Sequence, residues 1–132
     1  MRQQRDEHGK SVRLLRVGEQ MRHALADVLS RGEVRDEVLE RHIVSVTEVR
    51  VSPDLRHATA FIQPLGTKGE EADAVIAALK RNVRYLKGEV ARRVNTKYAA
   101  DLHFRLDESF DEATRIDAIL RSPQVARDLD HD

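Results

Sequence analysis

An apolar stripe with helical spacing runs through the second half of this chain and limits the folds open to it. Its members recur at steps of three or four residues and are Val75, Leu79, Val83, Leu86, Val90 and Val94. This spacing places them on one side of an α-helix, and that side must be buried against another element. Thr67 to Glu70 has the spacing of a capping box. The sequence therefore predicts one long helix, or two nearly coaxial ones, from this box to about Thr96.

A second helical stripe lies near the N-terminus. It consists of Leu14, Val17, Met21, Leu25 and Val28, and Gly32 follows as a helix stop. These residues predict a helix that begins at Ser11. Residues 1–10 are polar, and we expect them to form a flexible tail.

β-branched residues dominate the segment 41–51 and predict a strand. Its apolar phase slips between Val46 and Val49, which indicates a bulge or burial of both faces. The turn Ser52-Pro53-Asp54 follows, because Pro pre-sets φ and Asp can bond its own backbone. Residues 58–63 read as a second strand, so the short connection predicts an antiparallel hairpin.

Alternating apolar and polar residues over 102–107 predict a third strand. A second capping box opens a short helix over 109–120, and a polar acidic tail follows to the end of the chain. The predicted order is α-β-β-α-α-β, and 132 residues suffice for one core. We therefore expect an α+β domain over 11–108, with a three-stranded sheet covered on one face by helices. The tail 1–10 and the segment 109–132 flank it.

Charge is distributed unevenly although the formal net charge is zero. Residues 80–97 contain seven basic residues and one acidic residue. Residues 101–132 contain nine acidic and four basic residues. Such asymmetry suggests a polyanionic partner for the basic segment.

The basic residues of this segment lie opposite the apolar stripe when they are placed on a helix. Lys80, Arg81, Arg84, Lys87 and Arg92 are expected to share one solvent face, and Arg93 and Lys97 to flank the buried stripe. A row of cations suits the phosphates of RNA, and Arg can bind a phosphate through two hydrogen bonds. Arg13 and Arg16 in the first helix, and Arg50 and Arg56 near the hairpin, are further RNA-binding candidates.

Two other interpretations of the basic face stay open. It could be a solvated surface balanced by acidic residues elsewhere in the chain. It could also dock an acidic protein partner, which would make the chain an adaptor between proteins. Salt dependence and competition with RNA separate the RNA-binding and adaptor hypotheses.

No catalytic motif stands out in the sequence. Cys is absent, and the six His residues lack metal-ligand spacing. His57 and His103 lie on predicted strands and could approach each other, so a small hydrolase is a third hypothesis. We expect no cofactor, metal or small-molecule substrate. No apolar run is long enough to span a bilayer or to form a secretory segment, and this predicts a cytoplasmic protein without a membrane partner.

Several segments together resemble the ribosome-binding factor A family of bacterial small-subunit assembly factors. They are Arg16 to Gln20 with Leu25 to Leu29, Val46 to Arg56, Ala58 to Gly66, and Leu102 to Asp107 with Ser109 and Arg115 to Asp117. The resemblance covers roughly residues 11–121 and implies a type II KH fold. The family has a helix-kink-helix in place of the GXXG loop, usually with an Ala-x-Gly motif. Here that position reads Asn82-Val83-Arg84, so Asn82 and Gly88 are the candidates for the kink.

The resemblance also implies a partner and a role. The partner would be the immature small (30S) ribosomal subunit, with its 16S rRNA and ribosomal proteins. The role would be non-catalytic support of late maturation, including processing of the rRNA 5′ end by other enzymes. Nothing in the sequence requires a dimer, and we expect a monomer.

Overall fold

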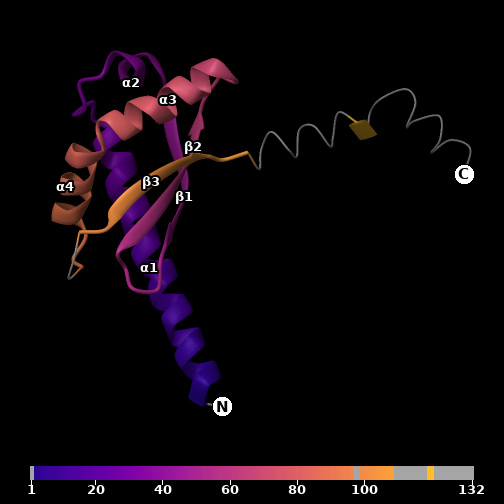
Figure 1. Cartoon of the computed structure of the whole chain (residues 1–132), viewed down its shortest axis with the longest axis vertical. Helices are drawn as coiled ribbons and strands as arrows, with labels where there is room; N and C mark the ends of the chain where they lie inside the picture. The colour runs from indigo at the N-terminus through magenta and orange to yellow at the C-terminus, as the bar shows by residue number, and fades with distance from the viewer. Residues whose placement is uncertain (1, 97–98, 109–118, 121–132) are drawn as a thin grey trace, which may run out of the picture.

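The computed structural model describes residues 2–96, 99–108 and 119–120, with side chains from residue 12 onward. Its elements are α1 (Arg2–Ser30), α2 (Glu37–Arg41), β1 (Val44–Val51), β2 (His57–Pro64), α3 (Glu70–Arg81), α4 (Val83–Arg93) and β3 (Asp101–Leu106) (Figure 1). The predicted α+β class and α-β-β-α-α-β order are confirmed. The short helix α2 is an addition that the sequence analysis missed.

The three strands form one sheet in the order β1-β2-β3. β1 and β2 are antiparallel, as predicted, and the register shifts between Val46 and Glu48, which confirms the bulge. The hairpin turn is closed by a hydrogen bond of 2.9 Å from the N–H of Leu55 to the carbonyl of Ser52. β3 runs parallel to β2 because α3 and α4 carry the chain back across one face of the sheet. The helices cover that face in the manner of a type II KH domain.

Alternation along β2 and β3 divides their side chains between a core and an open face. Ala58, Ala60, Ile62, Leu102 and Phe104 point into the core, where each is at most 7% exposed. No polar or charged side chain is buried within the part of the chain that the structure describes. Packing in this core is therefore apolar throughout, and charged groups that act on a partner must lie at its margins.

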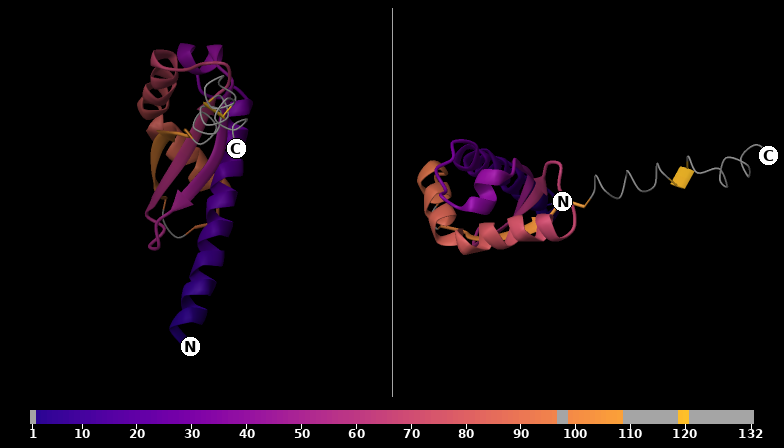
Figure 2. Two further views of the ribbon diagram at one scale, coloured as in Figure 1. Left: turned by 90° about the vertical axis from the view of Figure 1, so that its right-hand side faces the viewer. Right: turned by 90° about the horizontal axis from the view of Figure 1, so that it is seen from above.

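α1 begins at Arg2, so residues 2–10 are helical rather than a separate tail ahead of the first helix. Most of them are residues with high helix propensity, and the helix continues through Gly9. The N-terminal half of α1 extends beyond the β1–β2 turn in two perpendicular views (Figures 1 and 2). The C-terminal half packs on β1 and α4.

The predicted coaxial arrangement of the second helical segment is wrong. The helix breaks at Asn82, and the axes of α3 and α4 diverge sharply there (Figure 1). Of the two candidates for the kink, Asn82 supplies it, and Gly88 lies inside α4. The capping box predicted at Thr67 is also wrong, because Gly69 occupies the N-cap of α3 and no side chain caps it.

The helix predicted over 109–120 lies almost wholly outside the described residues. Only Ile119 and Leu120 are described, and both are helical and exposed. The acidic tail beyond them, like Lys97, is outside the described part of the chain.

Gly18 sets how closely α1 approaches the sheet. A Cβ added there would lie 2.4 Å from the carbonyl oxygen of Val49. We expect Gly18→Ala to lower the free energy of unfolding by about 1–3 kcal/mol, despite the better helix propensity of Ala, because a backbone atom must move. Gly88→Ala is the matched control, since a Cβ at Gly88 meets nothing within 4 Å. It should raise stability by about 0.5–1 kcal/mol in the same urea titration. Equal effects of the two substitutions would contradict the close approach.

Candidate nucleic-acid interface

A cleft of about 510 Å³ opens beside the break between α3 and α4. Its lining consists of Thr59 on β2, Lys80 at the end of α3, Val83 at the start of α4, and Leu102, His103, Phe104 and Arg105 on β3. The cleft exists because the chain turns at Asn82 and leaves the junction of the helices beside the outer strand of the sheet. It therefore joins the segment predicted to bind RNA to one edge of the sheet.

Three cations at or near this cleft have no acidic partner among the described residues. Lys80 and Arg105 line it, Arg84 lies on the first turn of α4 next to the lining residue Val83, and all three side chains are exposed. Among the described residues, no acidic side chain forms an ion pair with any of the three. They can therefore meet phosphates without first giving up a partner in the described part of the chain.

Asp36 holds the break in place. Its carboxylate accepts hydrogen bonds from the Asn82 amide at 2.9 Å, from the backbone N–H of Val38 at 3.0 Å, and from Arg81 at 3.3 Å. The Asn82 amide also donates to the carbonyl of Ala78 at 2.8 Å. Partial burial raises the pKa of Asp36, but the hydrogen bonds from Asn82 and Val38 and the charge of Arg81 outweigh that effect. The pKa consequently lies below its ordinary value.

Lys87 is paired with the first residue of β3. Its Nζ lies 2.6 Å from Oδ1 of Asp101, and this bond is the main cause of a lowered pKa for the Asp101 carboxyl. The pair joins α4 to β3. Lys87 is thus a cation whose charge is already balanced within the chain.

Arg92 and Arg93 are paired as well. Both contact Glu89, at 3.2 Å and 3.1 Å respectively. Arg93 also reaches Glu33 at 3.3 Å and Asp27 at 3.7 Å, and its side chain is only 26% exposed. Arg93 therefore ties α4 to α1 and to the segment after it, which is a structural role.

The predicted row of five cations on one acid-free face is not what the structure has. The break at Asn82 puts Lys80 and Arg81 on a different axis from the other three. Carboxylates partner Arg81, Lys87 and Arg92. The expectation failed because it assumed a straight helix and because it could not place Asp36 and Asp101 beside these side chains.

The remaining candidates do not line the cleft. Arg13 and Arg16 are exposed on α1, and Arg56 is exposed at the hairpin turn. Arg50 pairs with Glu48 at 2.9 Å, and its guanidinium lies 5.0 Å from the centre of the Phe61 ring. These residues do not join Lys80 and Arg84 in one site.

Two residues of this region were not singled out from the sequence. Arg105 was recognised only as an outward residue of a strand, and its position in the alternation was the available signal. Asp36 precedes Glu37 and Val38 in the pattern of a helix N-cap, which could have predicted α2. No sequence signal connects Asp36 with Asn82.

His57 and His103 do approach each other, as the sequence suggested. Nδ1 of His57 lies 3.2 Å from Nε2 of His103, and the ring centres are 5.4 Å apart. Both side chains are exposed on the open face of the sheet. Within the described residues, no group of three or more His, Cys, Asp or Glu side chains could hold a metal ion.

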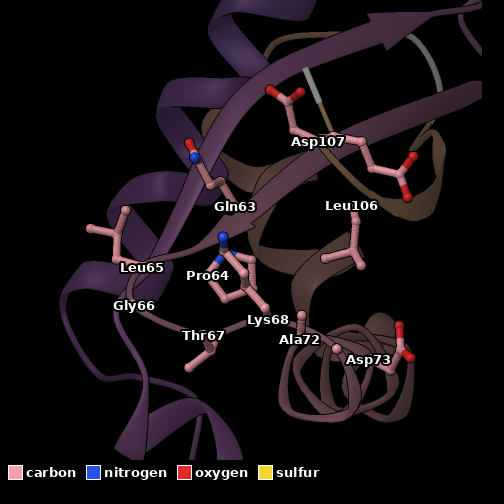
Figure 3. A pocket seen from close by; sticks show the side chains of 12 residues that line it. Gln63, Pro64, Leu65, Gly66, Thr67, Lys68, Ala72, Asp73, Leu106 and Asp107 are labelled. Carbon is pink, nitrogen blue, oxygen red and sulfur yellow. The ribbon is translucent and has the colours of Figure 1, made fainter. Parts of the chain in front are cut away.

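A larger cavity lies where β2 and β3 end. It encloses about 880 Å³ between the end of β2, the loop 65–69, the start of α3 and the end of β3 (Figure 3). The carboxylates of Asp73 and Asp107 stand around it, with Glu108 beside them, and Lys68 is the one basic residue among the described residues that line it. Phosphates would be repelled here, so the smaller basic cleft is the better candidate for RNA.

A family model described as ribosome-binding factor A matches residues 13–120. The chain belongs to the ribosome-binding factor A family. Ribosome-binding factor A of Rhizorhabdus wittichii is 64% identical over 132 residues, which cover 100% of this chain and 98% of that protein. The protein of the same name from Bradyrhizobium diazoefficiens is 58% identical over 122 residues, covering 92% of this chain and 83% of the relative.

Solved structures of ribosome-binding factor A share the fold. The crystal structure of the Thermus thermophilus protein superposes with a TM-score of 0.59 at 26% identity, covering 70% of this chain and 94% of that one. A homology model of the Thermus thermophilus factor, fitted into the cryo-electron-microscopy map of a 30S complex, has a TM-score of 0.54 at 26% identity. It covers 69% of this chain and 91% of that one. Among the helices described here, none is long and apolar enough to cross a membrane.

Replacing Asp36 tests its role at the break in this member of the ribosome-binding factor A family. We expect Asp36→Ala to lower the free energy of unfolding by about 1–2 kcal/mol, because α2 loses its cap and the Asn82 amide loses its acceptor. Glu40→Ala, an exposed substitution on α2, is the control and should have a smaller effect.

The effect of Asp36→Ala should also depend on pH. A carboxyl whose pKa is lowered in the folded state stabilises that state above its unfolded pKa, and the contribution is lost as pH falls through the folded value. The difference between wild type and Asp36→Ala should therefore be full at neutral pH and narrow below about pH 4. Denaturant titrations across that range measure it, and a difference independent of pH would contradict the charged hydrogen-bond network.

Proposed function

We propose that this protein binds the immature small (30S) ribosomal subunit through 16S rRNA, with the cleft beside Asn82 as its contact surface. The observation that carries the proposal is the cleft lined by Lys80 and Arg105, with Arg84 on the adjoining first turn of α4. All three side chains are exposed, and none of them has an acidic partner among the described residues. Membership in the family supports it, as does the fitting of the Thermus thermophilus factor into a 30S complex. The protein would act in the cytoplasm as a monomer.

The mechanism is binding without a catalytic step. Exposed cations displace the counterions condensed on rRNA, and their release drives association. Arg84 and Arg105 can each hold a phosphate through two hydrogen bonds, whereas Lys80 acts as a point charge. Binding that favours one rRNA conformer stabilises it by the difference in affinity for the two states. In this way the protein would support late maturation and the processing of the rRNA 5′ end by other enzymes. Ribosomal proteins next to the bound rRNA would be further contacts.

The structure suggests an order of importance among the predicted RNA-binding residues. Lys80, Arg84 and Arg105 come first because no described carboxylate competes for them. Arg81, Lys87 and Arg92 must give up an ion pair before they contribute fully, although exposed pairs of this kind are weak. Arg93 joins α4 to α1 through its ion pair with Asp27, so it ranks below them as an RNA-binding residue. Lys97, Arg13, Arg16, Arg50 and Arg56 stay candidates for secondary contacts.

Cosedimentation with small subunits, large subunits and free rRNA over a range of salt tests the proposal. We expect selective, salt-sensitive binding to small subunits. The double variant Lys80→Ala/Arg84→Ala should weaken it about tenfold or more near 0.1 M salt, and should reduce the slope of log K against log salt by about 0.7–0.9 per cation. Arg92→Ala removes an exposed cation that is already paired with Glu89, and it should weaken binding less than the double variant does.

Two results would count against this proposal. Equal binding to all particles, or to none, would remove the small subunit as the partner. Binding of the same strength by the double variant and by Arg92→Ala would remove the cleft as the contact surface. If the protein instead bound isolated acidic ribosomal proteins and did not bind free rRNA, the adaptor hypothesis would replace the RNA-binding proposal.

The ion pair between Lys87 and Asp101 allows a test in the opposite direction. Asp101→Asn removes a negative charge beside the cleft and releases Lys87 from its partner. We expect affinity for the subunit to rise severalfold at low salt, with a steeper salt dependence by about 0.7–0.9. The double variant Asp101→Asn/Lys87→Ala should cancel the gain. A gain that survives the loss of Lys87 would show that the released lysine is not its source.

A further inference from the structure

The open face of the sheet carries a run of flat side chains. His57 and Phe61 point outward from β2, and His103 points outward from the neighbouring β3. The two His rings are tilted by 33° with centres 5.4 Å apart, so they form a small continuous surface rather than two isolated side chains. Both are exposed although they lie on regular strands. Nothing in the packing of the core requires rings at these positions.

Phe61 extends this surface toward β1. Its ring is half-buried, and the guanidinium of Arg50 lies 5.0 Å from the ring centre. Glu48 holds that guanidinium at 2.9 Å and so restrains its position. A guanidinium over an aromatic ring presents a second flat face to solvent, and the Arg50 side chain is 69% exposed. The open face of the sheet thus carries planar groups from all three strands, which are Arg50 on β1, His57 and Phe61 on β2, and His103 on β3.

The planar surface is continuous with the basic cleft. Thr59, His103 and Arg105 are outward residues of the sheet, and each also lines the cleft that contains Lys80. An RNA strand whose phosphates contact Lys80 and Arg105 would therefore place its next nucleotides at the edge of β3, beside His103. The charge at the cleft and the rings on the sheet are two parts of one path.

We propose that the open face of the sheet is a stacking platform for the bases of single-stranded RNA whose phosphates are held in the cleft. The proposal rests on the proposed function, because it uses the same cleft and the same polyanion. Flat side chains stack on any base, so they favour unpaired nucleotides over a duplex, whose bases are already stacked. Sheets elsewhere bind RNA through outward aromatic side chains in this way. His103 is the central residue, and His57 and Phe61 extend the platform to either side.

Two oligonucleotides separate stacking from charge. The first is a single-stranded RNA of about ten nucleotides, and the second has the same length and phosphates with its central bases removed. Wild-type protein should bind the complete strand about tenfold more tightly than the strand with abasic sites. A fluorescent adenine analogue at a central position should be quenched on binding, which reports stacking directly.

Substitutions at His103 should change only the binding of the complete strand. His103→Ala should lose most of the tenfold preference, whereas His103→Tyr keeps a flat ring and should retain it. Ser45→Ala is the matched control, since Ser45 pairs with Gln63 at the far end of the sheet and lies outside the cleft. Circular dichroism and the urea midpoint of each variant show whether the fold is kept. Because His103 is exposed, we expect no loss of stability.

The outcomes distinguish this proposal from the proposed function. If wild type binds both strands equally, or if His103→Ala keeps the full preference, the stacking platform is overturned. The cleft would survive that result provided that Lys80→Ala/Arg84→Ala still weakened the binding of both strands. If the double variant bound both strands as tightly as wild type does, the assignment of the cleft as the phosphate-binding site would be wrong. Preference for a duplex of the same sequence would also overturn the platform.

Discussion

The carboxylate of Asp36 accepts a hydrogen bond of 2.9 Å from the amide of Asn82, and this contact lies at the break between α3 and α4 beside which the cleft opens. The same carboxylate caps α2 and binds Arg81 at the end of α3. By holding the chain where α3 ends, it directs α4 back along the sheet, where Lys87 can reach Asp101. A helix that ran straight through Asn82 would carry its second half away from β3. The cleft and its cations would then not exist in this form.

Ion pairing inside the chain decides which basic residues are available to a partner. The segment 80–97 has a large excess of positive charge, yet Arg81, Lys87, Arg92 and Arg93 each contact a carboxylate from the same chain. The charge of Arg93 serves to join α4 to α1, and that of Lys87 joins α4 to β3. The cations at the cleft are therefore a small part of the total. Position relative to the acidic residues matters more than the number of basic ones.

Features that depend on close neighbours in the chain were predictable. The bulge between Val46 and Glu48 and the turn at Ser52 follow from residue types a few positions apart. The kink was narrowed to Asn82 or Gly88, but the choice between them depends on Asp36, which lies 46 residues from Asn82 in the chain. The capping box at Thr67 failed for a related reason, since Gly69 adopts a positive φ of 64° and takes the N-cap itself. A spacing pattern does not report that backbone conformation.

The sequence by itself determined the class of fold, because the periods of its apolar residues require certain faces to be buried whatever their partners are. It also determined that basic residues are concentrated in the segment 80–97. Only the tertiary structure decided that β3 lies parallel to β2, that His57 meets His103, and that Arg105 joins Lys80 at one cleft. These contacts join residues far apart along the chain, and their distances depend on how the helices turn and pack. Periodicity indicates only which side of its own helix or strand a residue occupies, so it cannot predict these contacts between distant residues.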